Sequence, residues 1–360
     1  MTRAELRALR AEIDRIDGEI VSLAAKRKRV AYEIGLVKIK DGIEVRDKRR
    51  EAVVAEETER RARRLGLSKG TGKAIAKALV SDAVAVQRKT APRPLDGRKA
   101  LVVGGSGKMG EWTCRFLSCR GADVSVWDPR GRLQGYANVK RPEEAASDAD
   151  IIVVASPLGA SRDELAKVIG ANPRGMVFDV CSVKAHISGT LRSAASEGLK
   201  VTSVHPMFGP RAPSPEGLNV IVCGCGSAKA DKMAASLFAE AGAKVSKLSL
   251  EEHDELMAYA LALPHITALL FGGALAASGR SLEELTPAGG TSFARLLGIA
   301  REVSGESRRV YHDIQSLNPN TRKTLEAVER VLSDLKDAAL DEDPRAFGRI
   351  MDSERRYLEA

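Results

Sequence analysis

Three glycines with the spacing G-x-G-x-x-G, Gly105, Gly107 and Gly110, lie in the string GGSGKMG. Such a turn, placed between a strand and a helix, lets backbone N–H groups and the helix N-terminus hold a pyrophosphate. Asp128 follows about twenty residues later, where a carboxylate can accept hydrogen bonds from ribose hydroxyls. The predicted dinucleotide site consists of Gly105, Ser106, Gly107, Lys108, Met109, Gly110 and Asp128. Asp128 favours NAD because a carboxylate repels the extra phosphate of NADP, but the nearby Arg130 and Arg132 keep NADP as the alternative.

Three further strings carry polar side chains where a doubly wound sheet presents its ligand, at or beyond the carboxyl ends of strands. They are DVCSVK at residues 179–184, HPMFGP at 205–210 and, on a helix, ALPHITALLFG at 262–272. Two of the five histidines, His205 and His265, lie in these strings, and a histidine held near a reacting hydroxyl is the usual general base. The other three are predicted to be structural: His186, His253 and His312.

A third chemical signal is a buried cation near the N-terminus. Apolar residues recur three and four apart from Leu6 to Val37, which predicts one long helix, and the repeat is broken at Arg27. Burial of an unpaired guanidinium costs several kcal/mol, so Arg27 needs a carboxylate beside it, from the protein or from a ligand.

The elements that must position these residues form three predicted domains: 1–92, 98–250 and 251–360. The first is three helices, at about 6–37, 45–65 and 73–89, and the proline-containing string TAPRPLDGR links it to the second. Strands then alternate with helices, which predicts a parallel, doubly wound Rossmann-type sheet. The predicted strands are 99–103, 123–127, 151–155, 176–180, 201–204, 219–222 and 244–248. The last domain has helical periodicity only.

The composition, with 44% hydrophobic and 29% charged residues, is that of a globular protein. Residues 1–92 hold 23 Lys and Arg against 14 Asp and Glu, so the whole net charge of +9 belongs to the first domain. With Tyr32 as its one aromatic residue, that domain provides poorly for base stacking, so a small polyanion is a better partner than nucleic acid. The five cysteines form no C-x-x-C pair, which argues against a zinc site or a disulfide framework. We expect no membrane span, because no stretch approaches about 18 apolar residues, and a cytoplasmic location.

From residue 99 onward the chain resembles prephenate dehydrogenase, on the motifs G-G-x-G-x-M-G, S-V-K, H-P-M-F-G-P and E-H-D in this order. The resemblance implies oxidative decarboxylation of prephenate with NAD and no metal. It implies that His205 is the catalytic base, that Ser182 bonds the same substrate hydroxyl, and that His265 helps to hold substrate. A substrate carboxylate would bind Arg301, or Arg295 as the alternative. Arg211 departs from the acidic residue that many relatives have after H-P-M-F-G-P.

Residues 4–89 resemble the all-helical class of chorismate mutase, which rearranges chorismate to prephenate without a nucleophile. The matching positions are Arg10, Arg27, Lys38, Asp47, Arg50, Glu51 and Gln87. By this resemblance, Arg27 and the partner-contributed Arg10 bind carboxylates, Lys38 and Gln87 address the ether oxygen, and Asp47 and Glu51 bond the ring hydroxyl region with Arg50 nearby. Ala83 replaces a serine that relatives often have. The long first helix also predicts a homodimer.

These resemblances together predict a bifunctional enzyme of tyrosine biosynthesis, with tyrosine as a candidate feedback ligand. The alternatives are a dehydrogenase whose helical domain serves only for dimerisation or regulation, and a dehydrogenase fused to a nucleic-acid-binding helical domain. Arogenate is the alternative to prephenate, since the two differ only in a side chain remote from hydride transfer.

Overall fold

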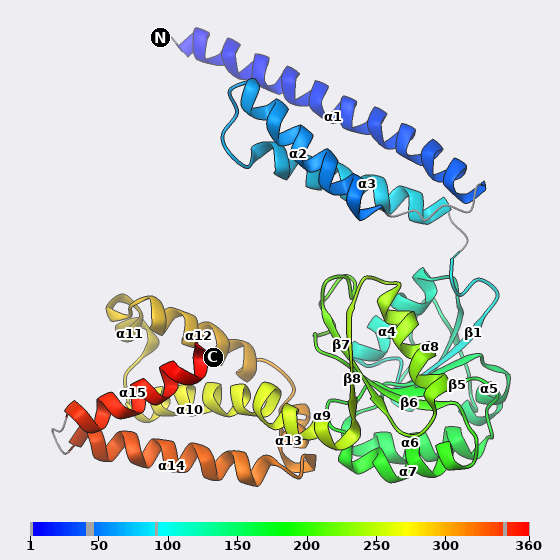
Figure 1. The fold of residues 1–360 in the computed structure, drawn as a ribbon, viewed down its shortest axis with the longest axis vertical. Coiled ribbons are helices and arrows are strands. Elements are labelled where there is room, and N and C mark those ends of the chain that lie inside the picture. The colour runs from blue at the N-terminus through cyan, green and yellow to red at the C-terminus, as the bar shows by residue number, and fades with distance from the viewer. Residues whose placement is uncertain (1–2, 41–46, 91–92, 341–343, 360) are drawn as a thin grey trace. The chain divides into compact units, whose positions relative to one another are not determined.

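A computed structural model describes residues 3–40, 47–90, 93–340 and 344–359. The chain folds into two compact units, Met1–Asp96 and Gly97–Ala360, which differ in fold class (Figure 1). The predicted domain boundary at residue 250 lies within the second unit.

The first unit is built from three helices, α1 (Arg3–Lys40), α2 (Lys48–Arg64) and α3 (Thr71–Thr90), which confirms the predicted helices. Asp47 caps α2, because its side chain accepts a hydrogen bond from the backbone N–H of Arg50 at 2.9 Å. The buried Glu59 of α2 accepts hydrogen bonds from the backbone N–H groups of Gly70 (2.9 Å) and Lys73 (3.1 Å), so it holds the start of α3 against α2.

Much of the apolar stripe on α1 is exposed in the single chain. Ile13, Ile20 and Leu23 are 57%, 59% and 63% exposed, far more than core residues such as Ala31 and Ala76. An apolar face of this length, on a helix about 57 Å long at 1.5 Å per residue, is unusual for a monomer.

The second unit begins with an eight-stranded sheet in the order β3-β2-β1-β4-β5-β6-β7-β8. The strands are β1 (Lys99–Val103), β2 (Asp123–Trp127), β3 (Ala137–Asn138), β4 (Ile151–Val154), β5 (Met176–Asp179), β6 (Val201–Pro206), β7 (Asn219–Gly224) and β8 (Lys244–Ser249). All neighbours are parallel except β6 and β7. The strand order reverses between β1 and β4, which is where doubly wound sheets bind ligands.

The predicted sheet was correct in its seven strands and wrong in two details. The short edge strand β3 was not predicted, and β7 runs antiparallel to β6. No helix lies between β6 and β7, whereas a parallel connection needs a crossover of a dozen or more residues that is usually helical. The chain therefore turns back and reverses the last two strands.

Five helices cover the two faces of this sheet (Figure 1). They are α4 (Lys108–Cys119), α5 (Pro142–Asp148), α6 (Leu158–Gly170), α7 (Ala185–Ser196) and α8 (Ala228–Ala239). Helices α4 and α8 pack through the stacked rings of Phe116 and Phe238, whose centroids are 5.0 Å apart. The core between the sheet and the helices includes Leu101, Ile152 and Leu191, which are inaccessible to solvent.

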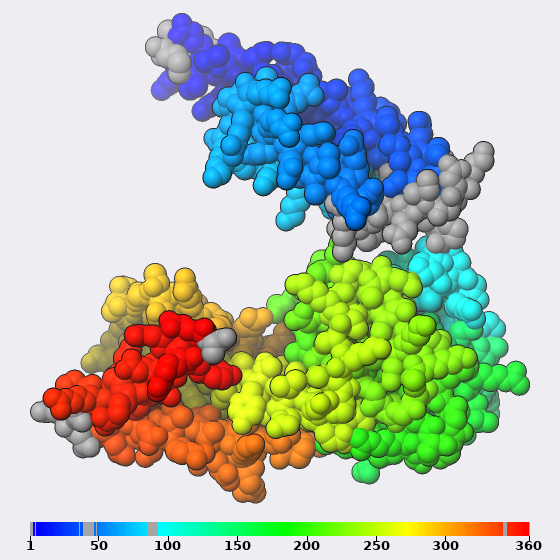
Figure 2. Space-filling model, viewed as in Figure 1, coloured from blue at the N-terminus to red at the C-terminus, as the bar shows by residue number. Residues whose placement is uncertain are grey.

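The remaining described residues are helical, as predicted. The elements are α9 (Leu250–Met257), a π-helical turn η1 (Ala258–Ala262), α10 (Leu263–Ala277), α11 (Leu282–Ala288), α12 (Thr291–Ser304), α13 (Arg308–Leu317), α14 (Thr321–Leu340) and α15 (Pro344–Leu358). Figure 2 shows these helices, yellow to red, as a lobe beside the green sheet lobe, with a hollow in the surface between them.

The continuous helical run Leu250–Ala277 is long and apolar enough, by length and composition, to cross a membrane. The expectation that no stretch approaches this length was wrong, because residues 256–279 carry no charged side chain. The run begins with the buried polar residues His253 and Asp254, and its second half packs against α12. Burial within the chain accounts for little of this hydrophobicity, since only 17% of the apolar window is buried and Leu269 and Leu270 of α10 are 53% and 48% exposed.

Candidate active sites

The glycine-rich turn joins β1 to α4 as predicted, and its shape depends on the absence of side chains. A Cβ on Gly105 would lie 2.4 Å from Cγ1 of Val126, and one on Gly110 would lie 2.1 Å from the carbonyl oxygen of Gly104. Gly104 itself has φ +80°, a conformation that favours glycine. Gly107 is the N-cap of α4, so the turn leads directly into a helix N-terminus, where an anion is stabilised.

Asp128 lies just beyond the end of β2, and its side chain is inaccessible to solvent. Its carboxylate accepts a hydrogen bond from the backbone N–H of Ser106 in the glycine-rich turn at 3.1 Å. It also pairs with the guanidinium of Arg130 at 3.2 Å. Lys108, at the start of α4, forms an ion pair with Glu306, which follows α12, at 3.2 Å. The predicted residues thus come together at the strand-order reversal, as a ribose and pyrophosphate site requires.

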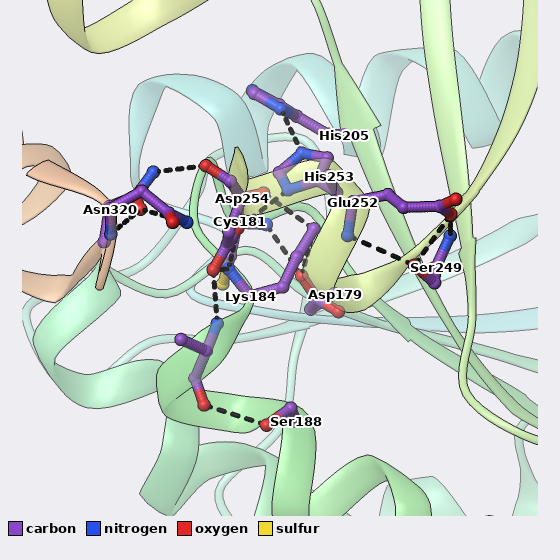
Figure 3. A network of polar contacts seen from close by, with 12 residues as sticks. Asp179, Cys181, Lys184, Ser188, His205, Ser249, Glu252, His253, Asp254 and Asn320 are labelled. Atoms are coloured by element: carbon purple, nitrogen blue, oxygen red, sulfur yellow. Dashed lines mark hydrogen bonds and ion pairs between the residues drawn. The ribbon is translucent and has the colours of Figure 1, made fainter. Parts of the chain in front are cut away.

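His205 lies on β6 and is 4% exposed, and it takes part in a buried chain of polar contacts (Figure 3). Its Nδ1 lies 2.9 Å from Nε2 of His253 on α9. Nδ1 of His253 lies 2.8 Å from Oδ1 of Asp254, whose carboxylate also accepts hydrogen bonds from the backbone N–H groups of Lys184 and Ala185. The strings at 179–184 and 205–210 and the start of α9 therefore meet at one place.

A buried ion pair between Lys184 and Asp179 stabilises the loops that meet here. Nζ of Lys184 donates to Oδ1 of Asp179 at 2.9 Å and to the carbonyl oxygens of Cys181 (2.7 Å) and Val204 (2.9 Å). Both charged side chains are inaccessible to solvent. Because Lys184 binds the carboxyl ends of β5 and β6 together, it fixes the loop that carries the half-buried Ser182.

The helical residues predicted to hold substrate lie on α10 and α12. His265 of α10 packs against the ring of Tyr311 on α13, with centroids 4.3 Å apart, and burial lowers the pKa of its imidazole. Arg301 lines a groove of about 340 Å³ between α10 and α12, together with Gly272, Leu297 and Ala300. Arg295 is exposed on α12 and does not line this groove. None of the described contacts joins either arginine to His205.

A cavity of about 450 Å³ lies among the three helices of the first unit. Its lining residues are Arg27, Val30, Ala31, Ile34, Lys38, Asp47, Arg50, Glu51, Val54, Val80, Ala83 and Val84. Arg27 donates to the carbonyl oxygen of Leu79 at 2.7 Å, so α3 holds this guanidinium beside the cavity. The cavity combines three cations with an apolar wall, as an anion with an apolar body requires.

One predicted residue of this site, Arg10, lies apart from the cavity. Arg10 is exposed on α1, 17 residues or about 25 Å along the helix from Arg27. Gln87 is on α3, but its side chain lies outside the described part of the structure.

Family models match two separate segments of the chain. Residues 9–88 match the family described as chorismate mutase type II, and residues 128–247 match the nucleotide-binding domain of prephenate dehydrogenase. The T-protein of Enterobacter agglomerans is 26% identical over 313 residues, which cover 86% of this chain and 82% of that protein. The chain combines a chorismate mutase domain with a prephenate dehydrogenase domain.

Two further matches are to proteins named as dehydrogenases alone, and they cover less of this chain. The 4-amino-4-deoxyprephenate dehydrogenase of Streptomyces pristinaespiralis is 28% identical over 70% of this chain and 88% of its own length. Prephenate dehydrogenase from A. aeolicus, solved in complex with hydroxyphenyl propionate and NAD+, aligns with a TM-score of 0.61 at 20% identity. That alignment covers 74% of this chain and 99% of the A. aeolicus chain, and it confirms the fold of the dehydrogenase part.

Several residues of the two domains were missed by the sequence analysis. His253 was assigned a structural role, yet it contacts His205 across 48 residues of sequence. Asp254 and Lys184 were within quoted motifs but received no role. The directly adjacent histidine and aspartate in E-H-D were an available signal, because a carboxylate often orients an imidazole. The role of Glu59 could not be predicted from the sequence. The N–H groups that donate to it belong to the turn at the start of α3, and apolar periodicity does not predict the position of a turn.

Substitution of Gly110 by alanine is expected to weaken NAD binding to the dehydrogenase at least tenfold. The new Cβ would need the space of the Gly104 carbonyl oxygen, 2.1 Å away, so the turn must open and its N–H groups must move. Dissociation constants from titration with NAD measure the effect. Gly189→Ala on α7 is the matched control, because nothing lies within 4 Å of its added Cβ. Equal affinity in the two variants would contradict this account of the turn.

The pH dependence of the dehydrogenase should reflect the setting of His205. Burial, then the ammonium of Lys184 and then His253, lower the pKa of His205 well below its usual value. A lowered pKa keeps the imidazole neutral, and able to accept a proton, at more acidic pH. We therefore expect the acid limb of kcat/KM for prephenate to lie below about pH 6.5, the ordinary histidine value. Initial rates across pH measure it, and a limb at or above 6.5 would argue against His205 as the base.

Proposed function

We propose that the mutase domain rearranges chorismate to prephenate and that the dehydrogenase part oxidatively decarboxylates prephenate to 4-hydroxyphenylpyruvate. The observation that carries the proposal is the presence of both sites in one chain: a cationic helical cavity, and a buried histidine cluster on the sheet whose carboxyl edge also carries a dinucleotide turn. The similarity to a T-protein over 86% of the chain supports the combination.

In the mutase cavity, the protein's task is to hold chorismate compactly, because a pericyclic rearrangement needs no nucleophile. Arg27 supplies a guanidinium group suited to a carboxylate, Lys38 supplies a donor for the ether oxygen, and Arg50 lies near the ring hydroxyl region. Asp47 and Glu51 provide acceptors for the ring hydroxyl, and we assign Gln87 to the ether oxygen. Ala83 makes the wall apolar where relatives often have a hydroxyl.

In the dehydrogenase, His205 accepts the proton of the ring hydroxyl while the carbon that bears it loses a hydride. The proton returns to the ring oxygen as the carbon–carbon bond to the carboxylate breaks, carbon dioxide leaves and the ring becomes aromatic. Ser182 bonds the same hydroxyl and His265 holds the substrate body. We keep Arg301 as the partner of a substrate carboxylate, because it lines a groove and Arg295 does not.

The glycine-rich turn fits a dinucleotide, because Cβ atoms at Gly104, Gly105 and Gly110 would collide with neighbouring protein atoms, so glycines alone allow the tight turn that leads into the N-terminus of α4. Bound nicotinamide would supply the hydride acceptor. Asp128 would bond the ribose hydroxyls, which favours NAD. Arg130 is paired with Asp128 and so offsets the negative charge that would repel the extra phosphate of NADP. NADP is therefore kept as the alternative cofactor. Rates of reduction of NAD and NADP at equal concentrations decide between them.

The substrate of the dehydrogenase is tested by comparing prephenate, arogenate and 4-amino-4-deoxyprephenate at equal concentration with NAD. The third compound is included because the S. pristinaespiralis relative is named for it. We expect the highest kcat/KM with prephenate. A higher value for either of the others would replace prephenate as the substrate and leave the assignment of the site unchanged.

We propose that the mutase acts as a homodimer in which Arg10 enters the cavity of the partner subunit. Arg10 lies about 25 Å along α1 from Arg27, too far to reach its own cavity, and the exposed stripe on α1 offers an apolar face for the partner helix. Mixed dimers of Arg10→Ala and Arg27→Ala chains contain one intact site and should regain mutase activity. Failure of refolded mixtures to regain activity would contradict the shared site.

Three further assignments belong to the same proposal. Tyrosine, whose ring and carboxylate resemble those of the product, is a candidate inhibitor of the dehydrogenase, and assays with added tyrosine test this. A cytoplasmic location agrees with five free cysteines, which reducing compartments maintain. Within the dehydrogenase part, residues 98–250 would bind the cofactor and residues 251–360 would contribute to the substrate site and to dimerisation.

A further inference from the structure

The catalytic histidine proposed above is held by a second histidine from a distant part of the sequence. His205 on β6 and His253 on α9 are 4% and 0% exposed, and their rings meet edge to face with centroids 5.0 Å apart. Nδ1 of His205 and Nε2 of His253 are 2.9 Å apart, so one of the two nitrogens carries the proton and the other accepts it. Which nitrogen carries the proton decides which nitrogen of His205 is free to act as a base.

Asp254 determines the direction of this hydrogen bond. Its Oδ1 faces Nδ1 of His253 at 2.8 Å and also accepts from the backbone N–H of Lys184 at 2.8 Å. Its Oδ2 accepts from the same Lys184 N–H at 3.0 Å and from the N–H of Ala185 at 2.7 Å. Since a carboxylate only accepts, Nδ1 of His253 must donate to it. Burial lowers the pKa of His253, so the imidazole is neutral and its Nε2 has no proton. His205 therefore donates through Nδ1, and its Nε2 keeps a free lone pair.

We propose that His253 and Asp254 are positioning residues that hold His205 in the tautomer with an unprotonated Nε2, the form that can take the proton of the substrate hydroxyl. The inference rests on the proposed dehydrogenase function of His205. The same carboxylate fixes the loop of Ser182 through the N–H groups of Lys184 and Ala185, so one residue orients both groups that address the hydroxyl.

The side chain of Asp254 allows a substitution that reverses the chain of bonds with little change in shape. In Asp254→Asn, the amide oxygen can take the place of Oδ2, which accepts from Lys184 at 3.0 Å and from Ala185 at 2.7 Å. The amide nitrogen at the Oδ1 position then gives up the 2.8 Å bond from the Lys184 N–H, faces His253 and donates to its Nδ1. His253 must then donate through Nε2, and His205 must carry its proton on Nε2, where it blocks the base. The wrong tautomer in a comparable triad costs about 10⁴-fold in kcat.

The test combines kinetics with 15N NMR of histidine-labelled full-length protein, in which five histidine side chains are assigned by substitution. In the wild type, we expect the signal of a protonated Nδ1 and a bare Nε2 for His205. In Asp254→Asn we expect the opposite pattern, with kcat for prephenate lowered at least 100-fold and KM for prephenate and NAD changed less than threefold. His253→Leu removes the hydrogen-bond partner of His205. This variant should also lower kcat, and His205 should then populate both tautomers.

The adjacent pair on α13 provides a matched control, because Nδ1 of His312 lies 3.2 Å from Oδ1 of Asp313 but the His312 side chain is 70% exposed. His312→Leu should leave kcat within twofold of the wild type. An unchanged tautomer of His205 in Asp254→Asn, or an unchanged kcat after the tautomer has reversed, would overturn the proposal. The NMR result stands by itself if the wild type fails to oxidise prephenate, so a failure of the proposed function would be recognised separately. If Asp254→Asn does not fold, His253→Leu and His253→Gln decide by the same two measurements.

Discussion

Replacing His205 by asparagine is expected to lower kcat for prephenate oxidation by about 10²- to 10⁴-fold, the usual contribution of a positioned general base. Asparagine retains a polar side chain of similar reach but cannot take up a proton near neutral pH. The neighbouring imidazole of His253 is bonded to the Asp254 carboxylate, so it is not expected to replace the lost base. Steady-state NADH formation from prephenate measures the loss.

Two controls accompany this variant. Rearrangement of chorismate by the same protein should be unchanged, since His205 and the mutase cavity belong to different compact units. NAD affinity should also be unchanged, since the glycine-rich turn does not include His205. A variant with more than a tenth of the wild-type kcat for prephenate would show that the base is another group.

The second large effect is expected in the mutase. Arg27→Ala should lower kcat/KM for chorismate by about 10²- to 10³-fold, because it removes a cation held in place for a carboxylate at a site where alignment determines the rate. Arg27→Lys should recover only part of the loss, since an ammonium lacks the planar fork that binds a carboxylate at two points. The rate of chorismate loss without cofactor measures both variants.

Arg29→Ala is the matched control, because Arg29 is an exposed arginine two residues away that does not line the cavity. It should retain mutase activity within about twofold, as surface substitutions usually do. Circular dichroism and melting curves check that Arg27→Ala still folds, since its guanidinium also bonds the Leu79 carbonyl of α3. Equal activity of the Arg27 and Arg29 variants would contradict the assigned cavity.

Local sequence patterns were sufficient to predict most of the fold. The repeat of apolar residues three and four apart, sustained over more than thirty residues, predicted α1. The alternation of short apolar runs with helices predicted seven of the eight strands. The antiparallel pairing of β6 and β7 was missed, because strand direction depends on the connection between them, which has no periodic signal. The apolar run in Leu250–Ala277 was underestimated, because the strings within it were considered for their histidine and not for the absence of charge.

The sites were predicted where residue types carried a motif and missed where geometry joined distant residues. Arg27, Lys38, Asp47, Arg50 and Glu51 do line one cavity, although they come from α1 and from the start of α2 with its N-cap. The contact of His205 with His253 was not predicted, because it depends on where α9 packs against the end of β6. Arg10 differs from these residues, because the cavity that it is proposed to enter belongs to another copy of the chain.

The central claim, that one chain performs both steps, is tested most directly by adding chorismate to the purified protein and supplying NAD only after the chorismate signal has fallen. We predict loss of chorismate without cofactor, accumulation of prephenate, and then NADH in an amount equal to the prephenate consumed. If chorismate persists until the end while added prephenate yields NADH, the helical domain is not a mutase and serves another purpose, such as dimerisation. If chorismate is lost and neither prephenate nor arogenate yields NADH or NADPH, the assignment of the dehydrogenase is wrong.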